Sequence, residues 1–75
     1  MPTADELKQR IEAAIPGATA AVESPDDVHF SAHVAAPAFA GKSRVQQHQL
    51  VYEALKGQMG GALHALSLQT GIPNT

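Results

Sequence analysis

The fold is decided by residues 18–35, which read ATAAVESPDDVHFSAHVA. In the second half of this stretch the side chains alternate as in a half-buried strand, and one face holds Val28, Phe30, Ala32 and Val34. Residues 18–23 alternate more weakly, so a strand there rests on Thr19, Val22 and the bounding turns. The intervening Ser24-Pro25-Asp26-Asp27 is a turn sequence, and residues 18–35 are therefore predicted to form a hairpin.

An amphipathic helix is predicted before this hairpin. Thr3 is a capping residue, and Glu6 follows it at the spacing of a capping box. The apolar side chains then recur at helical spacing and form one stripe, made of Leu7, Ile11, Ala14 and Ile15. Pro16-Gly17 is predicted to end the helix, because both residues interrupt helical backbone.

A second helix is predicted after the hairpin. Ser43 and Gln46 again have capping-box spacing, which places the start of the helix at Ser43. Spacings of three and four residues predict a core-facing stripe formed by Val45, His48, Tyr52, Leu55 and Met59. Gly60-Gly61 is predicted to end this helix.

A third strand is predicted at residues 63–70. One of its faces carries His64, Leu66 and Leu68, and the other carries Leu63, Ala65 and Ser67. Because both faces are partly apolar, this strand is expected in the interior of the sheet. The resulting order, α-β-β-α-β, predicts one α+β domain over residues 1–75, with two helices on one face of a three-stranded sheet.

The composition excludes several classes of function. The 75 residues include four histidines and no cysteine, and the formal net charge is −2. Without cysteine there is no disulfide, no thiolate nucleophile and no self-contained iron–sulfur site. Neither a Ser-His-acid arrangement nor a phosphate-binding loop is present, so no enzyme is predicted. No apolar run is long enough for a membrane span and no signal peptide is visible, so a cytoplasmic location is expected.

The histidines at strand ends are candidate metal ligands. His29 lies beside the turn and His64 begins the last strand, so these two and Asp26 would form a three-ligand set if the strand ends converge. The alternative is that each histidine is structural. On the same reasoning His48, on the apolar stripe, is expected to be packed, and His33, in mid-strand, is expected at the surface.

Positive charge gathers at the start of the second helix. Lys42 and Arg44 flank the capping Ser43, and a helix N-terminus of this kind is able to receive a phosphate group. The alternative is an ordinary solvated helix start. The net charge of −2 argues against bulk binding of nucleic acid.

Three segments resemble the signature of BolA-like proteins. Residues 39–52, FAGKSRVQQHQLVY, match the pattern Phe-x-Gly-x-x-x-x-x-x-His-x-x-Val-Tyr. Val28-His29-Phe30 matches the His-Phe pair that begins the second strand in that family, and residues 64–70, HALSLQT, match its last strand. The segments occur in the family order and cover nearly the whole chain, so the resemblance is specific.

This resemblance implies a type II KH-like fold and a role without catalysis. Proteins of the family pair with monothiol glutaredoxins and share a bridged 2Fe–2S cluster, in iron–sulfur trafficking and iron regulation. Carried over, His64 would be the cluster ligand from this chain. A second ligand would come from the loop between the first two strands, where Asp26 and His29 are the alternatives.

The resemblance also implies an alternative function. Some members are described as transcriptional regulators that bind DNA through the KH-like surface, and a role in the stress response is expected with that activity. The matching positions here are Lys42 and Arg44, with His48 behind them on the helix. Apart from its partner, the protein is expected to be a monomer or a weak homodimer, with no membrane contact.

Overall fold

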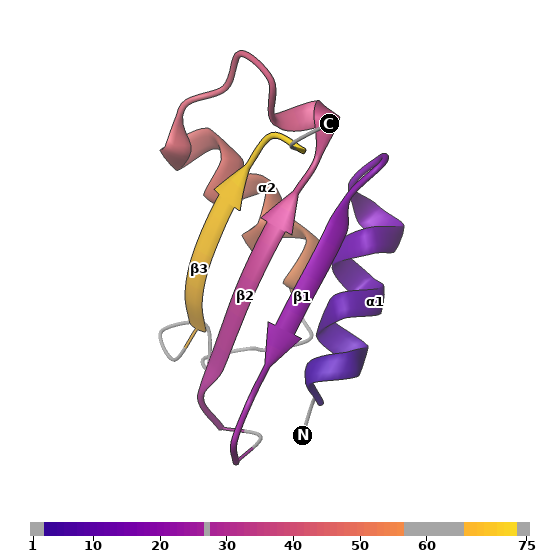
Figure 1. Cartoon of the computed structure of the whole chain (residues 1–75), viewed down its shortest axis with the longest axis vertical. Helices are drawn as coiled ribbons and strands as arrows, with labels where there is room; N and C mark the ends of the chain where they lie inside the picture. Colours follow the sequence, from indigo (N-terminus) through magenta and orange to yellow (C-terminus); the bar gives the residue numbers. More distant parts are fainter. Residues whose placement is uncertain (1–2, 27, 57–65, 74–75) are drawn as a thin grey trace.

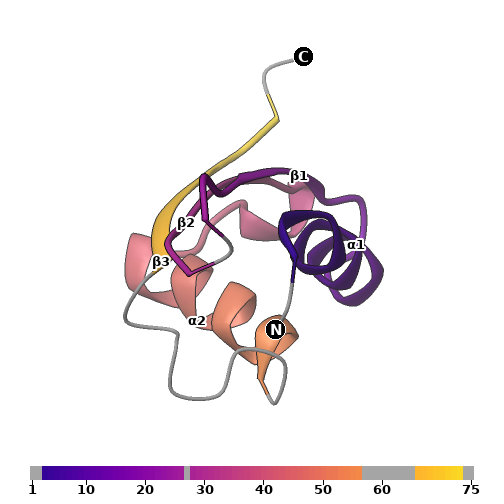
Figure 2. The ribbon, with the colours of Figure 1, turned by 90° about the horizontal axis from the view of Figure 1, so that it is seen from below.

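The computed structural model describes residues 3–26, 28–56 and 66–73. Within them the chain forms α1 (Ala4–Ala14), β1 (Thr19–Glu23), β2 (Phe30–Ala35), the short 3-10 helix η1 (Pro37–Phe39), α2 (Arg44–Leu55) and β3 (Leu66–Gly71). Both α-helices lie on one face of a three-stranded sheet, as Figure 2 shows. The α+β class and the element order predicted from the sequence are thereby confirmed.

Helix α1 is set by its cap and its apolar stripe. The Thr3 hydroxyl accepts a hydrogen bond from the Glu6 N–H at 3.2 Å, as expected for an N-cap. Leu7, Ile11 and Ile15 are buried. Ala14, which was predicted on the same stripe, is exposed because the chain leaves the helix at Ile15.

Strand β2 begins two residues later than the alternating pattern indicated. Phe30, Ala32 and Val34 are buried as predicted, but Val28 is 46% exposed. The reason is the Asp26 side chain, whose Oδ1 accepts hydrogen bonds from the N–H groups of Val28 and His29 and so holds both residues in the turn. The hairpin itself is confirmed, with β1 antiparallel to β2.

The order of strands corrects one prediction. The sheet order is β1-β2-β3, and β3 pairs in parallel with β2, so the interior strand is β2 and β3 lies at an edge (Figure 1). In β3 the helix-facing Leu66 and Leu68 are buried or half-buried, whereas Ser67 and Gln69 are exposed. The apolar residues that suggested an interior strand, Leu63 and Ala65, lie outside the described residues.

Helix α2 meets the core with only part of the predicted stripe: Leu55 is buried and His48 and Tyr52 are half-buried, but the first residue of the stripe is exposed. The complete capping box of Ser43 and Gln46 is confirmed, but Val45 is 66% exposed. The buried residues are Val51 and Leu55. They share a face with Gln47, four positions before Val51, and a polar residue there hid the true register from a hydrophobicity pattern.

Gln47 is half-buried, and both the nitrogen and the oxygen of its side-chain amide form hydrogen bonds. Its Nε2 donates to the carbonyls of Phe39 and Lys42, and its Oε1 accepts from Thr70 Oγ1 at 2.7 Å. These bonds join α2 to η1 and to β3. They replace the solvation that the buried amide loses.

The end of α2 also differs from expectation. The helix ends at Leu55, and Lys56 has extended backbone, whereas Gly60-Gly61 was predicted as the end. Met59, Gly60 and Gly61 lie outside the described residues. No helix among the described residues is long and apolar enough to cross a membrane.

Glu12 joins α1 to the outer edge of β1. Its Oε2 accepts from the Ala20 N–H at 3.0 Å and from Lys8 Nζ at 2.6 Å. The Ala20 N–H, and after it the Lys8 ammonium, lower the pKa of Glu12 below its ordinary value. A lowered pKa means that this carboxylate adds stability above its unfolded-state pKa, and that the contribution is lost as the pH falls through the folded-state pKa.

We therefore expect Glu12→Gln to be less stable than the natural chain at pH 7, with a difference that shrinks below a pH of about 4. Urea unfolding at a series of pH values measures this. Glu53→Gln is the matched control, since Glu53 is exposed on α2 and the substitution changes the net charge equally. If both variants showed the same pH dependence, the Glu12 bonds would contribute nothing to folding.

Candidate functional site

The loop between β1 and β2 is organised by one carboxylate. Asp26 Oδ1 accepts from the Val28 N–H at 2.9 Å and from the His29 N–H at 2.8 Å. Asp26 Oδ2 lies 2.9 Å from Nδ1 of the His29 ring. Both carboxylate oxygens are thus engaged within the loop. Ser24 Oγ adds a further bond at the strand end, to the His29 carbonyl.

The bonds to Asp26 define the state of the His29 ring. The His29 N–H, the His29 ring and the Val28 N–H hold the pKa of the Asp26 carboxyl well below its usual range. An ionised carboxylate only accepts hydrogen bonds, so His29 Nδ1 must carry the proton. In the neutral ring the lone pair then lies on Nε2. Because the His29 side chain is 72% exposed, that nitrogen is open to a ligand from outside.

This pair lies at the end of the sheet where β2 and β3 begin. His29 immediately precedes Phe30, and Phe30 is paired in register with Leu66, the first residue of β3. His64, the principal predicted ligand, lies outside the described residues and stands two positions before Leu66 in the sequence. Among the described residues, no group of three or more His, Asp or Glu side chains is placed to hold a metal ion. The described part of the site supplies one histidine–carboxylate pair.

The predicted basic site is at the start of α2, away from this loop. Lys42 and Arg44 are both exposed, as a solvated helix start requires. His48, one turn along the helix, is half-buried and packs edge-on against Tyr52, with ring centroids 6.3 Å apart. Its Nε2 is buried and has no hydrogen-bond partner among the described residues. Sequence patterns gave no sign of this unpaired nitrogen.

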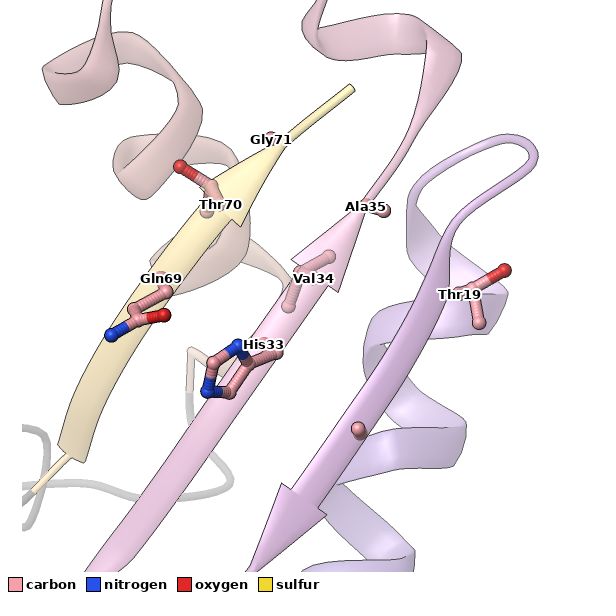
Figure 3. A pocket seen from close by; sticks show the side chains of 8 residues that line it. Thr19, His33, Val34, Ala35, Gln69, Thr70 and Gly71 are labelled. Atoms are coloured by element: carbon pink, nitrogen blue, oxygen red, sulfur yellow. The ribbon is translucent and has the colours of Figure 1, made fainter. Parts of the chain in front are cut away.

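His33 is at the surface, as predicted, on the sheet face that the helices leave open. Figure 3 shows its ring standing on β2 between β1 and β3, with Gln69 beside it. A shallow hollow of about 380 Å³ lies on this face, and small residues such as Thr19, Ala35 and Gly71 form its floor. His33 has no acidic neighbour in the hollow, so it is a suitable reference for the histidine at the loop.

Comparison with known proteins assigns the chain to one protein family. A family model described as BolA-like protein matches residues 4–75. The mouse BolA-like protein 1 is 40% identical over 53 residues, which are 71% of this chain and 39% of that protein. The chain spans less than half the length of the first curated relatives that it matches.

Solved structures agree with the family model. A bolA protein homologue from Coxiella burnetii has a TM-score of 0.83 and 39% identity, and the alignment covers 97% of this chain and 94% of that one. The BolA domain of SufE1 from Arabidopsis thaliana has a TM-score of 0.77 and 30% identity, with 93% and 91% of the two chains covered.

Proposed function

Because the chain belongs to the BolA-like protein family, we propose that it is a non-enzymatic adaptor that pairs with a monothiol glutaredoxin and shares a bridged 2Fe–2S cluster with it. The observation that carries the proposal is the His29–Asp26 pair in a chain without cysteine. Such a chain supplies no thiolate ligand, so the thiolates of a shared cluster come from the partner. The role is iron–sulfur trafficking or iron regulation.

His64 is the first ligand in this proposal, and His29 is the second. Both Asp26 oxygens are already bonded, so Asp26 acts as a positioning residue that fixes the ring orientation and the tautomer of His29. In the sequence, His64 stands two positions before Leu66. Leu66 itself is the register partner of Phe30, the residue after His29.

The chemistry of such a site is suited to transfer. Imidazole in place of thiolate raises the reduction potential of a 2Fe–2S cluster, and the cluster supplies the electron and iron–sulfur exchange chemistry when it is bound. In this proposal the protein contributes two imidazole nitrogen ligands, and one of them, His29, lies at the end of the sheet where β2 begins. Because His29 is exposed, a partner surface reaches it without rearrangement of the core.

The proposal is tested by reconstituting the cluster anaerobically on a mixture of this protein and a monothiol glutaredoxin. We expect His64→Ala and His29→Ala each to change the visible circular dichroism of the complex, because each removes an iron ligand. His33→Ala is the matched control: it removes an exposed histidine from the open sheet face and should leave the spectrum unchanged. Size-exclusion chromatography of the same mixtures reports whether the two proteins pair.

The outcomes separate the parts of the proposal. A natural-chain complex whose spectrum is unaffected by His64→Ala would contradict the ligand assignment, and equal effects of His29→Ala and His33→Ala would exclude His29. If no complex formed with the natural chain, the pairing itself would be wrong. Asp26→Asn should change the spectrum less than His29→Ala, because it leaves the ligand and removes only the group that positions it.

DNA binding is the second candidate function, and the exposure of Lys42 and Arg44 is the observation that favours it. Two cations neutralise about two phosphates, and affinity gained from so few contacts is low and changes little with salt. The net charge of −2 opposes association with a polyanion. The adaptor function is therefore preferred.

A further inference from the structure

The outer edge of β3 carries backbone groups that have no hydrogen-bond partner among the described residues, as follows from its register. The Gly71 carbonyl accepts a hydrogen bond from the Ala36 N–H across the β2 side. In a parallel pair the backbone groups of alternate residues point the same way, so Gln69 is also directed toward β2. The N–H and C=O groups of Leu68 and Thr70 consequently point away from the sheet. No hydrogen bond to them occurs among the described residues.

The two edges of the sheet differ in whether their outward backbone groups are hydrogen-bonded. At the β1 edge, the outward Ala20 N–H is bonded to the Glu12 carboxylate of α1. In Figure 1, α1 lies beside β1, while β3 is the outermost strand on the other side. The sequence of β3, LSLQTG, contains no charge and no proline, the residues that commonly prevent strand addition at an edge. The β3 edge is therefore the one open to a further strand.

A groove runs along this edge, between β3 and α2. It has a volume of about 310 Å³ and is lined by Arg44 and His48 from α2 and by Leu68, Gln69 and Thr70 from β3. Arg44 is exposed and forms no ion pair among the described residues. His48 Nε2 is buried, so it is closed to a ligand in the groove. The groove thus holds one cation, and none of its lining residues is acidic.

We propose that the β3 edge binds an extended segment of a partner protein by strand addition, and that this segment places a carboxylate side chain in the groove against Arg44. The backbone of the segment would bond to the outward groups of Leu68 and Thr70. Alternate side chains of an added strand face the helix layer, so one carboxylate reaches Arg44.

The observations favour a peptide over a nucleic acid at this surface. Free N–H and C=O groups in an alternating row match another peptide backbone and have no counterpart along a phosphate chain. A single cation, Arg44, matches one carboxylate. The groove lies toward the end of β3, whereas His29 lies at the beginning of β2, so both surfaces remain open together. This inference does not depend on the cluster.

The probe is a short capped peptide that alternates valine and glutamate, titrated into the ¹⁵N-labelled full chain. We expect the amide signals of Leu68 and Thr70 to shift, with smaller changes at β1. Two matched peptides separate the contributions. One has glutamine in place of glutamate, and the other is N-methylated at alternate backbone amides, which removes its pairing edge without changing its charge. Both should bind at least about tenfold more weakly.

Two variants with equal charge change test the groove. Arg44→Gln should weaken binding of the glutamate peptide by about tenfold and leave the glutamine peptide unaffected. Lys56→Gln, at the other end of α2, should change neither. Equal losses in both variants would mean a general charge effect and would overturn the proposal.

Other results would also overturn it. An unchanged affinity of the N-methylated peptide would exclude strand addition. Shifts at Leu68 and Thr70 with a short oligonucleotide, and none with any peptide, would assign the groove to nucleic acid. Because the peptide titrations use the natural chain, they remain decisive even if a variant folds poorly.

Discussion

Phe39→Ala is expected to lower the free energy of unfolding by about 3–5 kcal/mol, the usual cost of removing a buried phenyl ring. Phe39 is fully buried and is the largest completely buried side chain among the described residues. For a domain of this length the whole stability is about 4–11 kcal/mol. The substitution should therefore remove a large share of the stability, measured by urea titration followed by far-ultraviolet circular dichroism.

The expected loss is that of the ring alone, because the backbone carbonyl of residue 39 remains in the variant. This carbonyl accepts bonds from the Lys42 N–H and from Gln47 Nε2, which fix the entry into α2. Val45→Ala is the control, since Val45 is apolar but 66% exposed, and it should cost no more than about 0.5 kcal/mol. A loss at Val45 comparable to that at Phe39 would mean that the apolar stripe predicted from the sequence, and not the Val51 face, meets the core.

The fold was predictable where local chemistry and tertiary packing agree. Thr3 and Ser43 are caps in the sequence and in the structure, and the alternation through Phe30, Ala32 and Val34 marks the buried face of β2. The register of α2 was not predictable from hydrophobicity. The core face of α2 begins with a polar side chain, Gln47. Its three hydrogen bonds are made to residues that lie outside the helix.

The candidate site was predictable in its residues and less so in their roles. The sequence places Asp26 and His29 in one loop. Which of them acts as the ligand and which as the positioning residue depends on the atoms that each one bonds. Asp26 accepts from two backbone N–H groups and from the His29 ring, which no spacing reveals. The groove at the β3 edge was missed altogether, because β3 was predicted in the interior and His48 as an ordinary packed residue.

Proline at position 69 should be far more damaging than proline at position 68. The Gln69 N–H points toward β2, so Gln69→Pro removes a ladder hydrogen bond inside the sheet and is expected to cost about 3 kcal/mol. The Leu68 N–H points outward, so Leu68→Pro removes no hydrogen bond formed within residues 3–26, 28–56 and 66–73. It loses part of the Leu68 packing, at about 1 kcal/mol. Urea unfolding of the two variants gives both values.

Comparing Leu68→Pro with Gln69→Pro separates the effect of the direction in which the backbone N–H points from the general effect of proline in a strand. Both substitutions restrict the same strand and both precede Thr70, so a uniform intolerance of proline would give similar losses. Similar losses would mean that the outward groups of β3 are bonded within the chain, and the strand-addition surface would be excluded. A large loss at Gln69 with a small one at Leu68 requires a free edge, since only an N–H without a partner is removed at so little cost. In the natural chain, the Leu68 and Thr70 amides should then exchange with solvent faster than those of Gln69 and Gly71.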